Sequence, residues 1–410
     1  MAAFYPARVT LSPLQKRDLR LLALFRGFSF LGDAIALITL YLRIAQHGQG
    51  WMIAALSIAA ALPLVLLAPF AGYVVDHVPA KTFLALLCLG EGLVCVGIGL
   101  WHGDLATISL MALLTCGVAF SLPGYSALVP TLSGEENIVV AQSTLQSVQG
   151  IAITAGPALG GLLVGALGQS WPLYFDAISF ALAGLGTLML RTDRRPINRA
   201  HGEKTEQEMS AGVRLIFSDS YLRPVVVTVA VFMLSIGAVN VAEVFFVTRT
   251  LHASDLMYGL VGTSFGAGSI AGALSARALN QEPLSLVKTA LLCVAFISAL
   301  LGAVGLMEHV AYIFPLMAVT GFAAGVVNVS ASTLLAVQTP ETLRGRVFAA
   351  TGALFTSAEI SSMVLGGLLL TLVAPRTIFQ LAGVLSILSV LIVGPLELRT
   401  SHRAHKAQRP

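Results

Sequence analysis

The sequence predicts an all-α membrane protein with twelve transmembrane helices in two six-helix bundles. The composition is one reason, because 56% of the residues are hydrophobic and only 11% are charged, against roughly 25% charged in soluble domains. A second reason is a series of apolar stretches near the roughly 20 residues that span a bilayer as a helix. A third is a strong bias in the placement of positive charges. The apolar stretches are continuous rather than alternating, which excludes a transmembrane β-barrel.

Each apolar stretch predicts one helix, and each polar or glycine-containing gap predicts one connection. The expected helices cover residues 18–44, 50–74, 82–101, 105–130, 138–166, 171–191, 222–248, 256–278, 284–306, 310–336, 347–374 and 377–397.

The lysines and arginines give the chain a direction across the membrane. Twenty of the 24 fall in every second gap if the N-terminus is cytoplasmic. The opposite gaps hold only Arg43, Arg249 and Arg376. This positive-inside bias predicts a multi-pass protein of the plasma (bacterial inner) membrane with both termini in the cytoplasm.

A polar interval in the middle of the chain divides the helices six and six. It predicts a first bundle over 1–191, a cytoplasmic linker over 192–221, and a second bundle with a short tail over 222–410. Within the linker, Ser210 to Phe217 forms either a short amphipathic helix at the membrane surface or a plain solvated segment. Sequence similarity between the halves predicts a pseudo-twofold axis along the membrane normal, with a substrate site near the midplane.

Several functions are excluded by what the sequence lacks. It contains no GxSxG, Walker A or HExxH motif, so we expect neither an enzyme nor a nucleotide-driven pump. The four cysteines have no metal-ligand spacing, and we expect no metal and no cofactor. The net charge of +4 is explained by cations that flank membrane helices, so no nucleic-acid partner is implied.

The loop between the second and third helices resembles a signature of the major facilitator superfamily. Its sequence GYVVDHVPAKT places Gly72, Asp76 and Lys81 on the conserved positions of the motif GxxxDRxGRR, with departures at three others. The resemblance extends over essentially the whole chain and implies the major facilitator fold, with Gly72 in a close helix contact. It also implies a cytoplasmic latch, in which Asp76 meets the start of the eleventh helix beside Arg344 and Arg346. A role for Asp76 as an ordinary loop acid is the alternative.

Two further strings resemble one branch of that superfamily. Gly156, Pro157, Gly160 and Gly161 on the fifth helix match the GPxxGG motif of drug/proton antiporters. The string RGRV at 344–347 resembles macrolide-efflux proteins and exporters of catecholate siderophores. Together they imply proton-coupled export.

Charged residues inside the apolar stretches are candidates for proton coupling, because each costs at least roughly 2.5 kcal/mol at the bilayer centre. Asp33, Glu359 and Glu243 are the expected proton-coupling residues, with helix packing as the alternative for each. We interpret Glu91 as structural or paired with Arg26, and Asp176, near the outer end of its helix, as interfacial.

Polar residues on several helices are expected to line the substrate cavity. Gln142, Gln146 and Gln149 share one face of the fifth helix through spacings of four and three. The alternative is a polar contact between helices. The expected cavity consists of Arg26, Gln142, Gln146, Gln149, Asn240 and Asn328.

These features predict a secondary active transporter that exports amphiphilic small molecules, a drug or a siderophore, by alternating access driven by protons. A nutrient symporter or facilitator is one alternative, and a lipid translocator or a transport-inactive receptor is another. The expected partners are the lipid bilayer, a small-molecule substrate and protons, and we expect a monomer.

Overall fold

A computed structural model describes residues 12–47, 50–134, 137–191, 213–276, 282–388 and 390–391 of the chain. These residues form helices joined by short connections, and no β-strand occurs among them. The expectation of an all-α protein is confirmed. The polar linker is helical at 213–218 where it is described, in agreement with the amphipathic helix that is one of the two interpretations of this segment.

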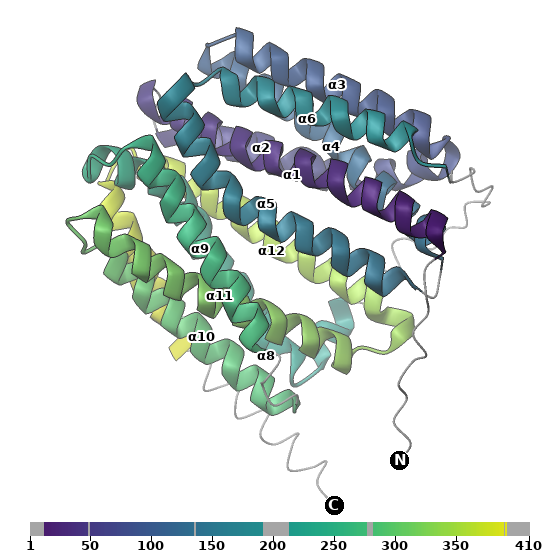
Figure 1. Cartoon of the computed structure of the whole chain (residues 1–410). Coiled ribbons are helices and arrows are strands. Elements are labelled where there is room, and N and C mark those ends of the chain that lie inside the picture. The colour runs from purple at the N-terminus through teal and green to yellow at the C-terminus, as the bar shows by residue number, and fades with distance from the viewer. Residues whose placement is uncertain are drawn as a thin grey trace, which may run out of the picture. The chain divides into compact units, whose positions relative to one another are not determined.

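Twelve helices of the described residues correspond to the twelve expected apolar stretches (Figure 1). The first six are α1 (Pro13–His47), α2 (Gly50–His77), α3 (Ala80–Leu100), α4 (Asp104–Ser133), α5 (Ile138–Leu167) and α6 (Trp171–Leu188). The second six are α8 (Leu222–Phe245), which continues as the π-helix η2 (Phe246–Thr250), α9 (Asp255–Ser275), α10 (Pro283–Val304), α11 (Val310–Gln338), α12 (Glu341–Leu369) and a last helix over Pro375–Leu388.

The outer surfaces of these helices are apolar, as a membrane protein requires. Nine helices of the described chain are long and apolar enough to cross a membrane. Large side chains such as Leu93, Leu292 and Leu372 are 64%, 71% and 79% exposed. Apolar surface on this scale is incompatible with water and fits contact with lipid.

The helices form two compact units. The first contains residues 1–40 and 59–200, and the second contains 41–58 and 201–410. The end of α1 and the start of α2 therefore belong to the second unit, whereas the apolar pattern places both helices entirely in the first bundle.

Contacts within the second unit explain why the α1–α2 connection belongs to it. The Arg249 guanidinium donates a hydrogen bond to the carbonyl oxygen of Ala45. Gly367 of α12 faces the side chain of Ala54, and a Cβ at Gly367 would overlap it. The connection is thus held by both a charged donor and close backbone packing.

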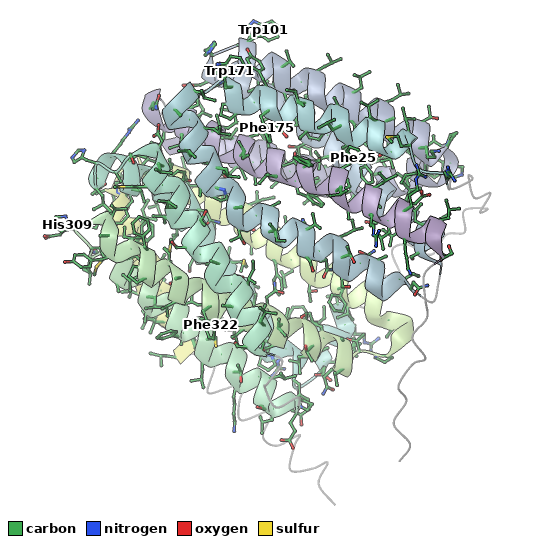
Figure 2. The ribbon with its side chains drawn as sticks, in the orientation of Figure 1. Phe25, Trp101, Trp171, Phe175, His309 and Phe322 are labelled. Carbon is green, nitrogen blue, oxygen red and sulfur yellow. The ribbon has the colours of Figure 1, made fainter. Side chains whose placement is uncertain are left out.

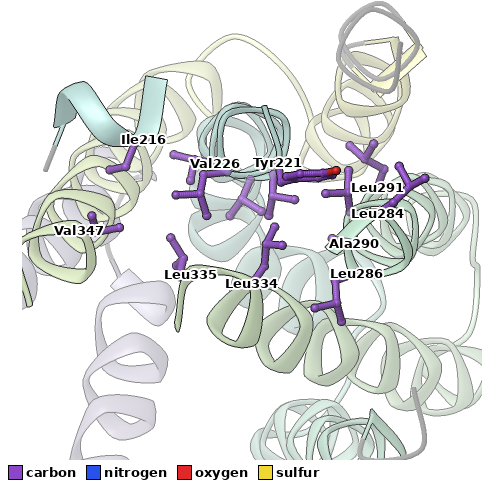
Figure 3. Close-up of a cluster of buried hydrophobic side chains, with 14 of the residues drawn as sticks. Ile216, Tyr221, Val226, Leu284, Leu286, Ala290, Leu291, Leu334, Leu335 and Val347 are labelled. Atoms are coloured by element: carbon purple, nitrogen blue, oxygen red, sulfur yellow. The ribbon is translucent and has the colours of Figure 1, made fainter. Parts of the chain in front are cut away.

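A cluster of buried hydrophobic side chains ties together one end of the second unit (Figure 3). The cluster contains residues from the first turns of α8, α10 and α12 and from the last turns of α11. The helix α11 therefore runs in the opposite direction to α10 before it and α12 after it. Ile216, from the short helix at 213–218, is 2% exposed and anchors that helix in the cluster.

The first unit has a matching cluster at the equivalent helix ends. Leu19 and Leu84 come from the start of α1 and α3, while Leu132 and Leu190 come from the end of α4 and the residues after α6. The repetition of this arrangement in both units agrees with the internal repeat found in the sequence.

Aromatic side chains mark the opposite end of the first unit. Trp101 follows α3 and Trp171 begins α6, and both project outward there (Figure 2). They are 63% and 61% exposed, and Trp171 packs edge-to-face on Tyr174 with ring centroids 6.0 Å apart. Exposed tryptophans at helix ends are typical of the membrane–water interface.

The closest helix packing in the second unit lies between α9 and α11. A Cβ on Gly268 or Gly272 would overlap the carbonyl oxygens of Ala318 and Phe322 of α11. Gly321 and Gly325 of α11 are equally close to the backbone of α9. Each helix therefore presents a GxxxG stripe to the other, the pattern by which membrane helices bring their backbones together.

Candidate functional site

A cavity of about 410 Å³ lies inside the second unit and collects three of the expected site residues. Asn240 and Glu243 reach it from α8, and Glu359 reaches it from α12. The Asn240 side-chain amide donates a hydrogen bond to Glu359 Oε1 over 3.2 Å. The remaining lining is mostly apolar and comes from α8, α9, α10 and α11. Among the described residues, the two carboxyl groups are therefore the only acidic groups that line it.

Small residues allow α8 and α12 to approach closely enough to form this site. A Cβ on Gly237 would overlap the carbonyl oxygen of Glu359, and one on Gly366 would lie 2.5 Å from the Cα of Ala238. The Ser362 hydroxyl accepts a hydrogen bond of 2.9 Å from the amide of Ala238. This close contact between the backbones of α8 and α12 fixes the position of Asn240 along α8 relative to Glu359 on α12.

The first unit contains a smaller acidic cavity of about 210 Å³, lined by Asp33 and Asp176. Asp176 is fully buried, with hydrogen bonds from the Cys95 thiol at 3.3 Å and the Ser179 hydroxyl at 3.1 Å. The expectation that Asp176 is interfacial is therefore wrong. The reason is Gly32, whose lack of a side chain leaves the space beside α1 that the Asp176 carboxylate fills.

The expected antiporter motif fixes α5 against α1 next to Asp33. A Cβ on Gly156 would overlap the side chain of Ala34, the residue after Asp33. One on Gly160 would lie 3.2 Å from both the Ile35 carbonyl oxygen and the Ile38 Cβ. Pro157 lies within α5 at the same level. The same kind of backbone contact thus supports the acidic cavity of each unit.

A groove of about 790 Å³ runs between α1 and α5 on the first unit. Its walls are almost entirely apolar, and exposed Leu24, Phe28 and Ile151 contribute to them. At one end it is lined by Lys16 and Arg20, and no acidic residue of the described chain lines it. The groove thus combines an apolar surface of drug size with a cationic end.

Arg26 lies inside the first unit, where it is 6% exposed. Its guanidinium donates to the Ser29 hydroxyl over 3.2 Å and lies over the rings of Phe30 and Tyr125, 4.4 and 4.2 Å from their centroids. In the part of the chain that the structure describes, it forms no ion pair with Glu91, as one interpretation of Glu91 required. Aromatic faces and a hydroxyl compensate this buried charge instead.

The other polar cavity candidates lie away from these spaces. The α1–α5 groove is lined from α5 by the stripe of Thr144, Val148, Ile151 and Ala155. Gln142, Gln146 and Gln149 occupy another face of α5, and Asn328 is exposed on α11. None of the four lines the cavities described above, so their role in binding stays a prediction.

The structure describes only some of the residues of the expected cytoplasmic latch. The side chains of Asp76, Arg344 and Arg346 lie outside the described residues, so their contact stays a prediction. Lys81 donates a hydrogen bond to the carbonyl oxygen of Leu190, at the end of the first unit. The close helix contact expected at Gly72 is absent from the described chain, since no atom lies within 4 Å of a Cβ placed there.

Apolar helices long enough to span a membrane, with carboxyl groups in a cavity of each bundle, are typical of a membrane transport protein. Residues 8–409 match the family described as transmembrane secretion effector. The chain belongs to this family of the major facilitator superfamily.

Bacterial relatives align with the chain over most of their own length. The chain is 26% identical over 397 residues to the uncharacterized MFS-type transporter YfiS of Bacillus subtilis, covering 92% of each chain. It is 21% identical over 354 residues to the multidrug efflux pump Tap of Mycobacterium tuberculosis, covering 82% of this chain and 83% of Tap. It is 25% identical over 313 residues to the enterobactin exporter EntS of Citrobacter koseri, covering 73% of this chain and 69% of EntS.

Solved structures of transporters share the fold. A bacterial homologue of the human lysosomal transporter Spinster, in an inward-facing and unoccupied conformation, aligns with a TM-score of 0.69 at 12% identity over 98% of this chain and all of that one. The nucleoside transporter NupG aligns with a TM-score of 0.69 at 13% identity over 93% of this chain and 98% of that one. The twelve-helix major facilitator fold, expected from the sequence, is confirmed.

Proposed function

We propose that this transporter exports amphiphilic small molecules across the bacterial inner membrane by proton-coupled alternating access. Relatives named as a multidrug efflux pump and an enterobactin exporter support export as the direction. The GPxxGG motif on α5 supports proton exchange, because it packs on α1 beside Asp33. Two carboxyl-lined cavities supply groups that could exchange protons with water when the transporter changes state.

The observation that carries the proposal is the groove between α1 and α5. Its volume of about 790 Å³ suits a drug-sized ligand. The apolar walls favour a ligand with a large hydrophobic body, and Lys16 and Arg20 favour an acidic or phenolic group at one end. A small hydrophilic nutrient would leave most of the apolar wall without a partner, so the groove argues against uptake of such a nutrient.

Transport by everted membrane vesicles tests this proposal. We expect vesicles carrying the protein to accumulate a fluorescent acidic amphiphile when respiration acidifies their interior, and to lose it when an uncoupler is added. Replacement of Lys16 and Arg20 by glutamine should lower uptake of the acidic probe roughly 30-fold, since two lost ionic contacts on the order of 1 kcal/mol each add to about 2 kcal/mol. Uptake of a neutral amphiphile should change little.

Arg17 provides a matched control for the cationic end of the groove. It lies next to Lys16, but its guanidinium hydrogen-bonds to Asp18 at 3.2 Å and it does not line the groove. Arg17→Gln should leave the preference between acidic and neutral probes unchanged. Accumulation in right-side-out vesicles instead would identify a symporter, and movement of fluorescent phospholipid alone would identify a lipid translocator.

The proposed orientation has its own test by cysteine labelling. In a background without the native cysteines, Lys204→Cys and Arg403→Cys should resist an impermeant maleimide added to intact cells. His102→Cys, in the connection after α3, should react. Reaction at position 204 in intact cells would contradict a cytoplasmic location for the linker and both termini.

A further inference from the structure

The first turns of α1 carry several polar residues that contact the rest of the first unit. The Gln15 side-chain amide donates a hydrogen bond of 3.1 Å to the carbonyl oxygen of Ser133, at the end of α4. Arg17 pairs with Asp18 at 3.2 Å, and the Asp18 carboxylate accepts a hydrogen bond of 3.0 Å from the amide of Arg191. These contacts hold the start of α1 against the ends of α4 and α6.

Lys16 and Arg20, in the same turns of α1, have exposed side chains. Within the described residues, neither side chain forms a hydrogen bond or an ion pair. Their spacing of four residues places them on one face of α1, about 6 Å apart along the helix axis. Both line the groove between α1 and α5, which has no acidic residue among its described lining residues. Two neighbouring cations of this kind favour a phosphate or carboxylate group.

The apolar wall of the groove extends from these cations toward the middle of both helices. The lining residues lie between positions 16 and 31 of α1 and between 144 and 155 of α5, whereas the helices continue to His47 and Leu167. Positions 16 and 31 are about 22 Å apart at 1.5 Å per residue. One leaflet, including its headgroups, is also about 20–22 Å thick. The groove therefore has the length of a single leaflet and does not reach the far end of either helix.

The wall of the groove is open at the surface of the unit. Leu24, Phe28 and Ile151 are 61%, 48% and 64% exposed. Apolar side chains exposed to this extent need an apolar neighbour, and an acyl chain of the adjacent leaflet provides one. The proposed orientation places the cationic end on the cytoplasmic side, where anionic lipids give the membrane surface its negative potential.

We propose that the α1–α5 groove holds an anionic phospholipid of the cytoplasmic leaflet, with its phosphate group between Lys16 and Arg20 and an acyl chain along the apolar wall. A phosphate ion in solution has the same charge chemistry, but it would leave the apolar wall uncovered. The groove ends near the midplane, so the lipid stays in its own leaflet. The site thus suits a lipid that is bound and not one that is moved across the membrane.

The bound lipid occupies the space proposed for the substrate, so an acidic amphiphile must displace it. Membranes richer in anionic lipid should therefore bind the acidic probe more weakly. This competition rests on the proposed function, whereas binding of the lipid depends only on the groove and its two cations.

Quenching of tryptophan fluorescence by brominated phospholipids tests the site in the full-length protein. The chain has three tryptophans, Trp51, Trp101 and Trp171. In a background where these are phenylalanine, Leu24→Trp places a single reporter in the groove. Bromine on the acyl chain quenches the reporter only when that chain lies against it.

Leu86→Trp is the matched control on another helix. Leu86 is 63% exposed on α3 and lies five residues after Lys81, much as Leu24 lies four residues after Arg20. It does not line the α1–α5 groove. A reporter at this position measures contact with the bulk lipid beside a cation at the same end of the unit.

Brominated phosphatidylglycerol should quench Leu24→Trp at a roughly 30-fold lower mole fraction than brominated phosphatidylcholine, which corresponds to about 2 kcal/mol for two cations. Leu86→Trp should show little preference. Lys16→Gln combined with Arg20→Gln should abolish the preference of the groove reporter. Arg17→Gln should retain it, because Arg17 is paired with Asp18 and does not line the groove.

Ile151→Trp, on the facing wall, is a second reporter in case tryptophan at position 24 blocks the groove. Equal quenching by the two lipids at both positions would overturn the proposal, as would a preference that survives the loss of Lys16 and Arg20. Relief of quenching by inorganic phosphate would identify a site for anions from solution and would also overturn it. Excess acidic amphiphile should relieve the quenching. If the proposed function fails, this relief is lost while the lipid preference remains, so the two failures are distinguishable.

Discussion

Replacing Gly268 with alanine is expected to destabilise the second unit strongly, although it adds only one methyl group. The added Cβ would overlap the carbonyl oxygen of Ala318 and would lie 3.0 Å from the amide nitrogen of Phe322. These are backbone atoms, so rotation of a side chain cannot relieve the contact. The helices α9 and α11 must separate, and we expect a loss of about 3 kcal/mol.

The thermal stability of the purified protein measures this effect. Gly165→Ala is the matched control, because Gly165 also lies inside a membrane helix but has no atom within 4 Å of a Cβ. The control should be neutral or more stable by up to about 1 kcal/mol, since alanine favours helix more than glycine does. Gly321→Ala, on the facing helix, should behave like Gly268→Ala because its Cβ would overlap the Phe265 carbonyl oxygen.

Equal melting temperatures for Gly268→Ala and Gly165→Ala would contradict this expectation. The contact between α9 and α11 would then be loose enough to absorb a methyl group, and the GxxxG stripes would not hold the helices together. If both variants had low melting temperatures, the loss would come from replacing a helix glycine as such and not from the contact between α9 and α11.

The helices are predictable from the sequence, because a membrane span leaves a long apolar signal and little else satisfies the backbone in lipid. The signal carries less information about where a helix ends. The apolar pattern predicts a first helix over 18–44, but α1 covers Pro13–His47 and includes charged residues in its first turns that are polar enough to end an apolar pattern. Lys16 and Arg20 in these turns are exposed and Asp18 is buried, while the backbone continues as helix.

The assignment of the α1–α2 connection to the second unit cannot be predicted from a hydropathy pattern. It depends on Arg249 reaching a backbone carbonyl at Ala45 and on the absence of a side chain at Gly367. The first of these contacts joins residues 204 positions apart in the chain. The pattern of charges places Arg249 on one side of the membrane but does not say what it contacts.

The residues of the candidate sites are predictable from the sequence, but their contacts with other helices are not. Asn240, Glu243 and Glu359 are predictable separately as buried polar residues, and the structure brings all of them to one cavity. The expectation for Asp176 fails because its position near a helix end suggests water, whereas Gly32 opens a buried space beside it. The GxxxG stripes of α9 and α11 are visible in the sequence, but which helix each one faces is not.

Asp33→Asn is expected to abolish uphill transport while the protein remains folded. Asp33 is half-buried in the acidic cavity of the first unit and follows Gly32, against which Asp176 packs. Asparagine keeps the size and polarity of the side chain but cannot release a proton. Substrate can then still bind and equilibrate, but the pH gradient no longer drives accumulation.

Everted vesicles with an imposed gradient of one pH unit measure this directly. Exchange of one proton per substrate allows about a tenfold accumulation, since tenfold corresponds to roughly 1.4 kcal/mol. With Asp33→Asn the ratio should fall to about one, while counterflow of preloaded substrate continues. Glu359→Gln is the comparison in the other unit, where Asn240 already hydrogen-bonds to the carboxyl group.

The two variants together distinguish the possible locations of proton coupling. If Asp33 alone couples, Glu359→Gln retains accumulation with an altered affinity for substrate, because its amide can still accept the hydrogen bond from Asn240. If both variants lose accumulation, the cavities of the two units act in one relay. Full accumulation by Asp33→Asn with unchanged dependence on the pH gradient would make Asp33 a packing residue, and the coupling group would then have to be sought at Glu359 or Glu243.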